Sequence, residues 1–152
     1  MTVDTAGLIL HVEDERPVRE AVAMLLRANG YLVNSAASGP EALQLASGGL
    51  HPDILIVDFS LDEEMNGAEV AEKIRRILGY TPPIIMMTGD LSNAEVPCIT
   101  EAPIWLTHKP LNPALLLAAL PGLIQVGRAM RSVLYPISRR GSGTVVWHPG
   151  PL

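Results

Sequence analysis

The sequence has little cysteine, little charge and few aromatic residues. Of 152 residues, Cys98 is the one cysteine, 18% are charged and 4% are aromatic. A single cysteine excludes an internal disulfide framework and a zinc site built from several cysteines, and it suits a reducing cytoplasm. The low charge, beside a hydrophobic fraction of 48%, argues against intrinsic disorder. The first residues lack the basic and then apolar pattern of a secretory signal, so we expect a cytoplasmic protein.

The charge that is present is divided unevenly along the chain. Residues 1–120 hold 7 basic and all 16 acidic residues, a net charge of −9, whereas residues 121–152 hold 4 arginines and no acidic residue, a net charge of +4. The acidic body argues against nucleic acid as a partner. We assign residues 1–120 to one domain and residues 121–152 to a C-terminal extension, with a helix over 122–135 and then a linker-like tail. That extension is too short for a separate DNA-binding domain.

Short apolar runs alternate with helical patterns along the domain. The runs are nearly continuous, as in strands buried on both faces, and they start near residues 8, 31, 53, 83 and 104. Apolar residues recur with helical spacing at 18–25, 42–46, 70–78 and 114–120. This alternation predicts parallel βαβ units and therefore an α/β protein with an open, doubly wound parallel sheet.

Polar residues follow the carboxyl ends of four predicted strands, where doubly wound sheets bind ligands. They are Glu13 and Asp14, Asp58, Thr88, and Lys109. Each alone fits an ordinary turn or cap, but three close carboxylates repel one another unless a cation intervenes, and carboxylates with water are typical Mg²⁺ ligands. Asp58 is then a candidate nucleophile toward a phosphoryl donor. The metal and Lys109 would neutralise the phosphoryl oxygens, and Thr88 would donate a hydrogen bond.

The same segments resemble the receiver domain of two-component response regulators. The matching motifs are Val12–Glu15, Ile56–Leu61 followed by Asn66-Gly67, Met87–Gly89 and Thr107–Leu111. The resemblance covers residues 7–120 and looks most like receivers attached to or partnered with hybrid histidine kinases. It implies a flavodoxin-like fold whose five parallel strands have the order 2-1-3-4-5.

The resemblance also implies a role for each site residue. Asp58 would accept a phosphoryl group from a histidine kinase or a histidine phosphotransfer domain. Asp14, Asp58 and the backbone carbonyl of Ser60 would bind Mg²⁺, with Glu13 acting through a water molecule. The implied contacts of the acyl phosphate are Thr88 and Lys109.

These features lead us to expect a single-domain response regulator that signals through protein–protein contacts. Such a chain is not an enzyme beyond catalysing its own phosphorylation and dephosphorylation. The alternative is a pseudo-receiver, a dimerisation or interaction module that does not switch. A phosphatase of the haloacid dehalogenase type would need an acidic residue two positions after its nucleophile, where Ser60 stands.

The sequence departs from the receiver pattern at two places. Receivers usually carry an aromatic residue three positions before the lysine, and Leu106 stands there. The fourth helix should lie within residues 90–103, which contain Pro97 and Pro103. A proline inside a helix costs about 3 kcal/mol, so we expect this helix to be short or broken. We therefore expect phosphorylation to act by ordering residues 90–103 and not by turning an aromatic ring.

The last helix of the domain lacks a polar face. No charged residue occurs from Pro110 to Gly127, yet the stretch is too short and too interrupted by proline to span a membrane. Because a helix that is apolar all round is normally covered, we expect a homodimer or a tail-covered interface at this helix. A kinase or phosphotransfer domain is a further candidate for covering it. His11, inside the first strand, is expected to be a packed core residue.

Overall fold

The computed structural model describes residues 6–61, 65–89, 104–109 and 111–134. The strands in this part of the chain are β1 (Leu8–Val12), β2 (Leu32–Ala36), β3 (Ile54–Asp58), β4 (Ile84–Thr88) and β5 (Ile104–His108). The helices are α1 (Arg16–Ala28), α2 (Gly39–Ser47), α3 (Gly67–Leu78) and α4 (Pro113–Leu134). Within these residues no helix has the length and hydropathy that crossing a membrane requires.

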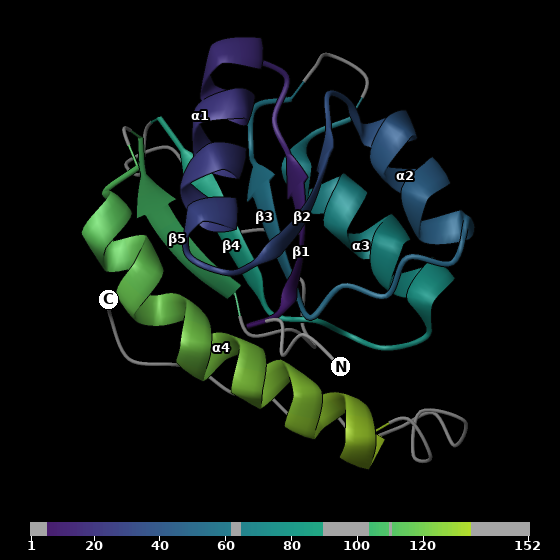
Figure 1. Cartoon of the computed structure of the whole chain (residues 1–152). Helices are drawn as coiled ribbons and strands as arrows, with labels where there is room; N and C mark the ends of the chain where they lie inside the picture. The colour runs from purple at the N-terminus through teal and green to yellow at the C-terminus, as the bar shows by residue number, and fades with distance from the viewer. Residues whose placement is uncertain (1–5, 62–64, 90–103, 110, 135–152) are drawn as a thin grey trace.

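The strands form one parallel sheet in the order β2-β1-β3-β4-β5, which confirms the predicted doubly wound fold. The central strands β3 and β4 are buried at every position. Strands covered on both faces need apolar side chains on both, which explains their nearly continuous apolar sequences. Because all the strands are parallel, their carboxyl ends lie at one edge of the sheet, the upper edge in Figure 1.

Two hydrophobic layers hold helices against the two faces of the sheet (Figure 1). One layer joins the sheet to α2 and α3, and the other joins it to α1 and α4. Alternate residues of β3 divide between the layers: Leu55 and Val57 face the first, while Ile54 and Ile56 face the second. His11 belongs to the buried interior, with no exposed surface, as expected.

Capping side chains begin the helices that flank the sheet. Ser38 accepts a hydrogen bond from the Glu41 backbone N–H at 3.2 Å, and the Glu41 carboxylate accepts one from the Ala37 N–H at 2.8 Å. Asn66 likewise accepts the Glu69 N–H at 3.0 Å and starts α3. These bonds satisfy amide groups that a helix start leaves without an intrahelical partner.

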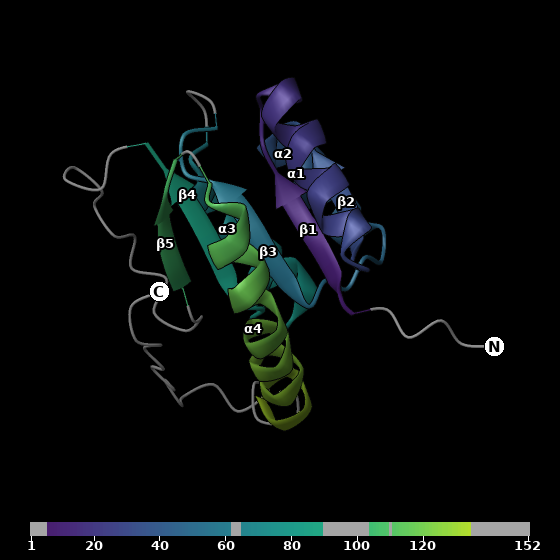
Figure 2. The same ribbon diagram turned by 60° about the vertical axis from the view of Figure 1, so that its left-hand side comes forward.

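The last helix is longer than we predicted. We ended it at Leu120 and expected a second helix over 122–135, but α4 is one helix of 22 residues with Pro121 inside it. Beyond the proline, Leu123 and Ile124 are buried in the α1 and α4 layer. Their burial offsets the cost of the proline. Figure 2 shows the second half of α4 passing the edge where the strands begin.

Two further expectations fall outside the described residues. The short or broken helix of residues 90–103 is one, and the linker-like tail after residue 135 is the other.

Candidate functional site

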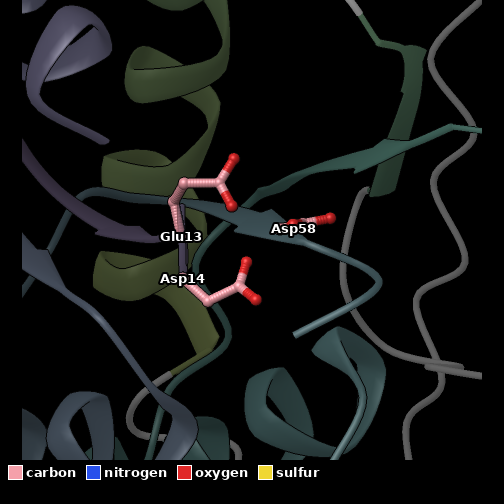
Figure 3. Close-up of side chains that lie close together, drawn as sticks. All are labelled: Glu13, Asp14 and Asp58. Carbon is pink, nitrogen blue, oxygen red and sulfur yellow. The ribbon is translucent and has the colours of Figure 1, made fainter. Parts of the chain in front are cut away.

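The carboxylates of Glu13, Asp14 and Asp58 gather at the carboxyl ends of β1 and β3 (Figure 3). Each contributes one oxygen to a group whose members all lie within 4.8 Å of one another. Glu13 and Asp14 follow β1 directly, and Asp58 is the last residue of β3. The two strands are paired neighbours in the sheet, so the topology alone brings acids 45 residues apart to one place.

Lys109 supplies a positive charge to this acidic cluster. Its Nζ donates a hydrogen bond to Asp58 Oδ2 at 2.8 Å and lies 3.4 Å from Glu13 Oε1. The Lys109 backbone N–H donates to the Thr88 carbonyl at 2.9 Å, which fixes the end of β5 beside the end of β4. Burial works to lower the pKa of the Lys109 ammonium, but its hydrogen bond with Asp58 and the charge of that carboxylate outweigh burial and raise the pKa.

Glu13 is held in a setting that disfavours its charge. Its side chain has no exposed surface, and Asp58 is 1% exposed. Burial raises the pKa of Glu13 to about 7, and the hydrogen bond and negative charge of Asp58 add to the effect. Three carboxylates facing one lysine leave a negative excess, which is the charge a bound cation would balance.

The phosphoacceptor candidate is oriented by backbone groups. Asp58 Oδ1 accepts a hydrogen bond from the Ser60 N–H at 3.1 Å. The Gly67 N–H donates to the Phe59 carbonyl at 2.9 Å, so the start of α3 lies against the loop after β3. A Cβ atom at Gly67 would run into the Asp58 carbonyl oxygen. Glycine is therefore required for this close approach.

The other predicted site residues lie at the same edge. Thr88 ends β4 and is buried, and Ser60 follows Asp58 by two positions.

His11 lies in the buried interior of the protein. Among the described residues, both of its ring nitrogens lack a hydrogen-bond partner. Burial, followed by the charge of Arg19, lowers the pKa of His11 to about 4, so this ring is neutral at physiological pH.

Sequence reasoning missed Arg19. Its Nη1 donates hydrogen bonds to the carbonyls of Glu13 at 2.9 Å and Asp14 at 3.3 Å. One signal was available, because α1 has arginine and no acidic residue in its first turn, where the helix dipole favours acidic side chains.

Fold and site together define a doubly wound parallel α/β protein with a cluster of three carboxylates and a lysine at the carboxyl edge. The sequence matches the family "Response regulator receiver domain" over residues 9–121, and the chain belongs to this family. Receiver domains are signalling modules and not classical enzymes.

Relatives with curated descriptions are longer proteins. The chain is 37% identical over 87 residues to Response regulator MprA of Mycobacterium ulcerans (strain Agy99), covering 57% of this chain and 36% of that protein. It is 35% identical over 92 residues to the transcriptional regulatory protein SphR of Synechococcus elongatus, covering 55% and 35% respectively. The chain thus spans about a third of the length of these relatives.

Solved structures agree with the fold. The receiver domain of the hybrid histidine kinase CckA is 33% identical, with a TM-score of 0.65, covering 78% of this chain and 100% of that domain. The CheY-like receiver domain protein of Methanospirillum hungatei JF-1 is 26% identical, with a TM-score of 0.69, covering 80% and 96%.

Proposed function

We propose that this receiver accepts a phosphoryl group on Asp58 from the phosphohistidine of a histidine kinase or a histidine phosphotransfer domain. The observation that carries the proposal is the charge arrangement around Asp58. Its Oδ2 accepts a hydrogen bond from Lys109 Nζ at 2.8 Å, and it shares a cluster with two further carboxylates. A nucleophile, a cation and a group of carboxylates able to hold a metal ion, gathered at one edge of the sheet, are the parts that phosphoryl transfer to a carboxylate requires.

The donor set fits Mg²⁺. All candidate ligands are oxygens. Within the described residues the buried Glu13 Oε1 makes no hydrogen bond and is 3.4 Å from its ion-pair partner Lys109 Nζ. Asp14, Asp58 and the Ser60 carbonyl would hold the ion, with Glu13 acting through water. When bound, Mg²⁺ would supply positive charge to the oxygens of the transferring group.

The residues of the chain then divide the chemistry. A carboxylate oxygen of Asp58 attacks phosphorus, so that an O–P bond forms while the P–N bond of the phosphohistidine breaks and its electron pair stays on the imidazole. Lys109 stabilises the charge on the phosphoryl oxygens, and the Thr88 hydroxyl donates a hydrogen bond to one of them. Thr88 ends β4, which pairs with β3, and Lys109 Nζ already donates to Asp58 Oδ2.

We further propose that phosphorylation acts through protein–protein contacts. Leu115 on α4 is 51% exposed in a segment without charged residues, which supports a homodimer at this helix. Leu106, in the place of the usual aromatic residue, packs against the α2 and α3 layer. That packing favours the alternative of a non-switching pseudo-receiver, and the following experiment separates the two.

The test is the intact mass after incubation with acetyl phosphate and Mg²⁺. We expect the wild-type protein to gain one phosphoryl group and Asp58→Asn to gain none. Asp53→Asn is a matched control, because it alters a buried aspartate at the opposite edge of the sheet, and it should still be phosphorylated. An unchanged mass of the wild-type protein would contradict phosphorylation at Asp58 and would favour the non-switching pseudo-receiver. Light scattering on the same samples tests the homodimer, which a monomer in both states would rule out.

A further inference from the structure

We propose that Arg19 is a positioning residue that fixes the metal-binding acids of the β1–α1 loop. This inference rests on the proposed function, since it concerns the same Mg²⁺ site. A single nitrogen, Arg19 Nη1, donates to the carbonyl of Glu13 at 2.9 Å and to the carbonyl of Asp14 at 3.3 Å. The arginine therefore ties the two acidic residues to the first turn of α1.

These two carbonyls belong to the point where the chain leaves the sheet. β1 ends at Val12, and the Glu13 N–H makes a last bond to the Ala36 carbonyl at 3.0 Å. From there the chain must turn into α1, whose first amide bond runs from the Arg19 N–H to the Glu15 carbonyl at 2.9 Å. Arg19 thus contacts the turn with both its backbone and its side chain. Groups that orient metal ligands in this way hold them in the geometry that the ion needs.

The charge of Arg19 has the opposite effect on a metal ion. A guanidinium next to the loop repels Mg²⁺, and it also stands in the helix turn where a positive charge is unfavourable. Removing that charge should therefore strengthen Mg²⁺ binding if Arg19 acts only as a charge. Removing the two hydrogen bonds should weaken binding if Arg19 positions the acids. The two roles predict opposite signs, which makes the inference testable by a single measurement.

The experiment is calorimetric titration of the full chain with MgCl₂. We expect Arg19→Met, which has an unbranched side chain without a donor or a charge, to bind Mg²⁺ about tenfold more weakly than the wild type, the usual loss when a group that orients metal ligands is removed. Arg19→Lys keeps an ammonium able to donate to a carbonyl, so it should recover part of the affinity. The expected order is wild type, then lysine, then methionine. Unchanged or tighter binding by Arg19→Met overturns the inference, as does Arg19→Lys binding more weakly than Arg19→Met.

Arg27→Met is the matched control. Arg27 lies on the same helix and donates to the Val33 carbonyl at 2.9 Å, but at the end of α1 far from the acids. The Arg27→Met variant should be less stable than the wild type and keep the wild-type affinity for Mg²⁺.

The variant Asp14→Asn separates the proposed metal site from the proposed role of Arg19. A wild type that binds no Mg²⁺, or an Asp14→Asn variant that binds it equally well, overturns the metal site and this inference together. A wild type that binds Mg²⁺ while Arg19→Met binds it equally well overturns the role of Arg19 alone.

Discussion

The two edges of the sheet each bury an aspartate beside a cation, but they treat its charge differently. At the edge where the strands begin, Asp53 faces Arg128, with Nε to Oδ1 and Nη2 to Oδ2 both at 3.2 Å. The Leu8 N–H donates to the same carboxylate at 2.9 Å. Within the part of the chain that the structure describes, the Asp53 carboxylate thus meets the Arg128 guanidinium and a backbone donor, so these two charges offset each other.

At the edge where the strands end, the charges are not balanced. Lys109 contacts both Asp58 and Glu13, and Asp14 adds a third carboxylate to the cluster. The raised pKa of Glu13 is a consequence of burial and of this crowding. The comparison teaches that the edge with Asp53 and Arg128 fastens α4 to the sheet, while the other edge keeps an excess of negative charge, which supports the proposed cation site.

The largest expected effect comes from loosening the edge where the strands begin, at Gly127. A Cβ atom there would lie 2.6 Å from Pro83 Cδ and 2.8 Å from the Asp53 carbonyl oxygen. We expect Gly127→Ala to lower the free energy of unfolding by about 2 kcal/mol, because overpacking must push α4 from the sheet. Urea unfolding measures the change. Gly122→Ala, on the same helix with nothing within 4 Å, should be as stable as the wild type or more so, and equal stability of the two variants would contradict the prediction.

A smaller effect should follow from breaking the ion pair of the same edge. We expect Arg128→Gln to cost about 1.5 kcal/mol, the low end for hydrogen bonds to a charged group, because Asp53 is 7% exposed while Arg128 is half exposed. Arg16→Gln is the control, since the Arg16–Glu20 pair is exposed and should contribute little. Thermal unfolding of both variants decides the point, and equal losses would mean that the pair at Asp53 is an ordinary surface pair.

At the other edge, where the strands end, removing the charge of Glu13 should raise the free energy of unfolding instead of lowering it. The folded protein holds the Glu13 proton up to a pKa of about 7, against 4.5 for the ordinary group. The resulting stability is complete below pH 4.5 and is lost as pH rises through about 7, since the folded state then binds more protons than the unfolded state. We expect the contribution of Glu13 to the stability of the metal-free protein to fall by about 0.8 kcal/mol between about pH 6.5 and pH 8.5.

Glu13→Gln should remove this loss and be the more stable protein at the alkaline end of the range. Urea unfolding of both proteins in a chelator, repeated across the pH range, tests the point. The buried His11, whose pKa is lowered to about 4, stabilises the fold by about 0.4 kcal/mol over the same range, because the unfolded chain loses its histidine proton there. This gain is the same in both proteins and cancels when they are compared. Parallel pH curves for wild type and Glu13→Gln would show that Glu13 is ionised throughout.

Much of the fold was predictable because the signals are local. Nearly continuous apolar runs marked β3 and β4, which are buried at every position. The predicted end of α4 at Leu120 was wrong for a physical reason. Pro121-Gly122 is a sequence that normally ends a helix, but the helix continues because Leu123 and Ile124 are buried against the sheet. Tertiary packing thus overrode the low helix propensity of proline and glycine, and that packing cannot be read from the neighbouring residues in the sequence.

The sequence predicted which polar residues would meet at the carboxyl edge of the sheet, and their roles stay a prediction; it did not predict the contacts that support them. Parallel strands place their carboxyl ends on one edge, so the acids and Lys109 had to meet once the alternation was recognised. The hydrogen bonds of Arg19 and the approach of Gly67 to the Asp58 carbonyl depend on side-chain and backbone geometry in the turns.

By itself, the sequence determined which segments form strands and helices and which polar residues stand at the strand ends, since both depend on short-range periodicity. Tertiary structure alone decided that Asp53 meets Arg128, 75 residues away, and that α4 runs on to Leu134. Both depend on contacts between segments whose separation in the chain says nothing about their distance. Packing the helices on both faces of the sheet is what brings those segments together.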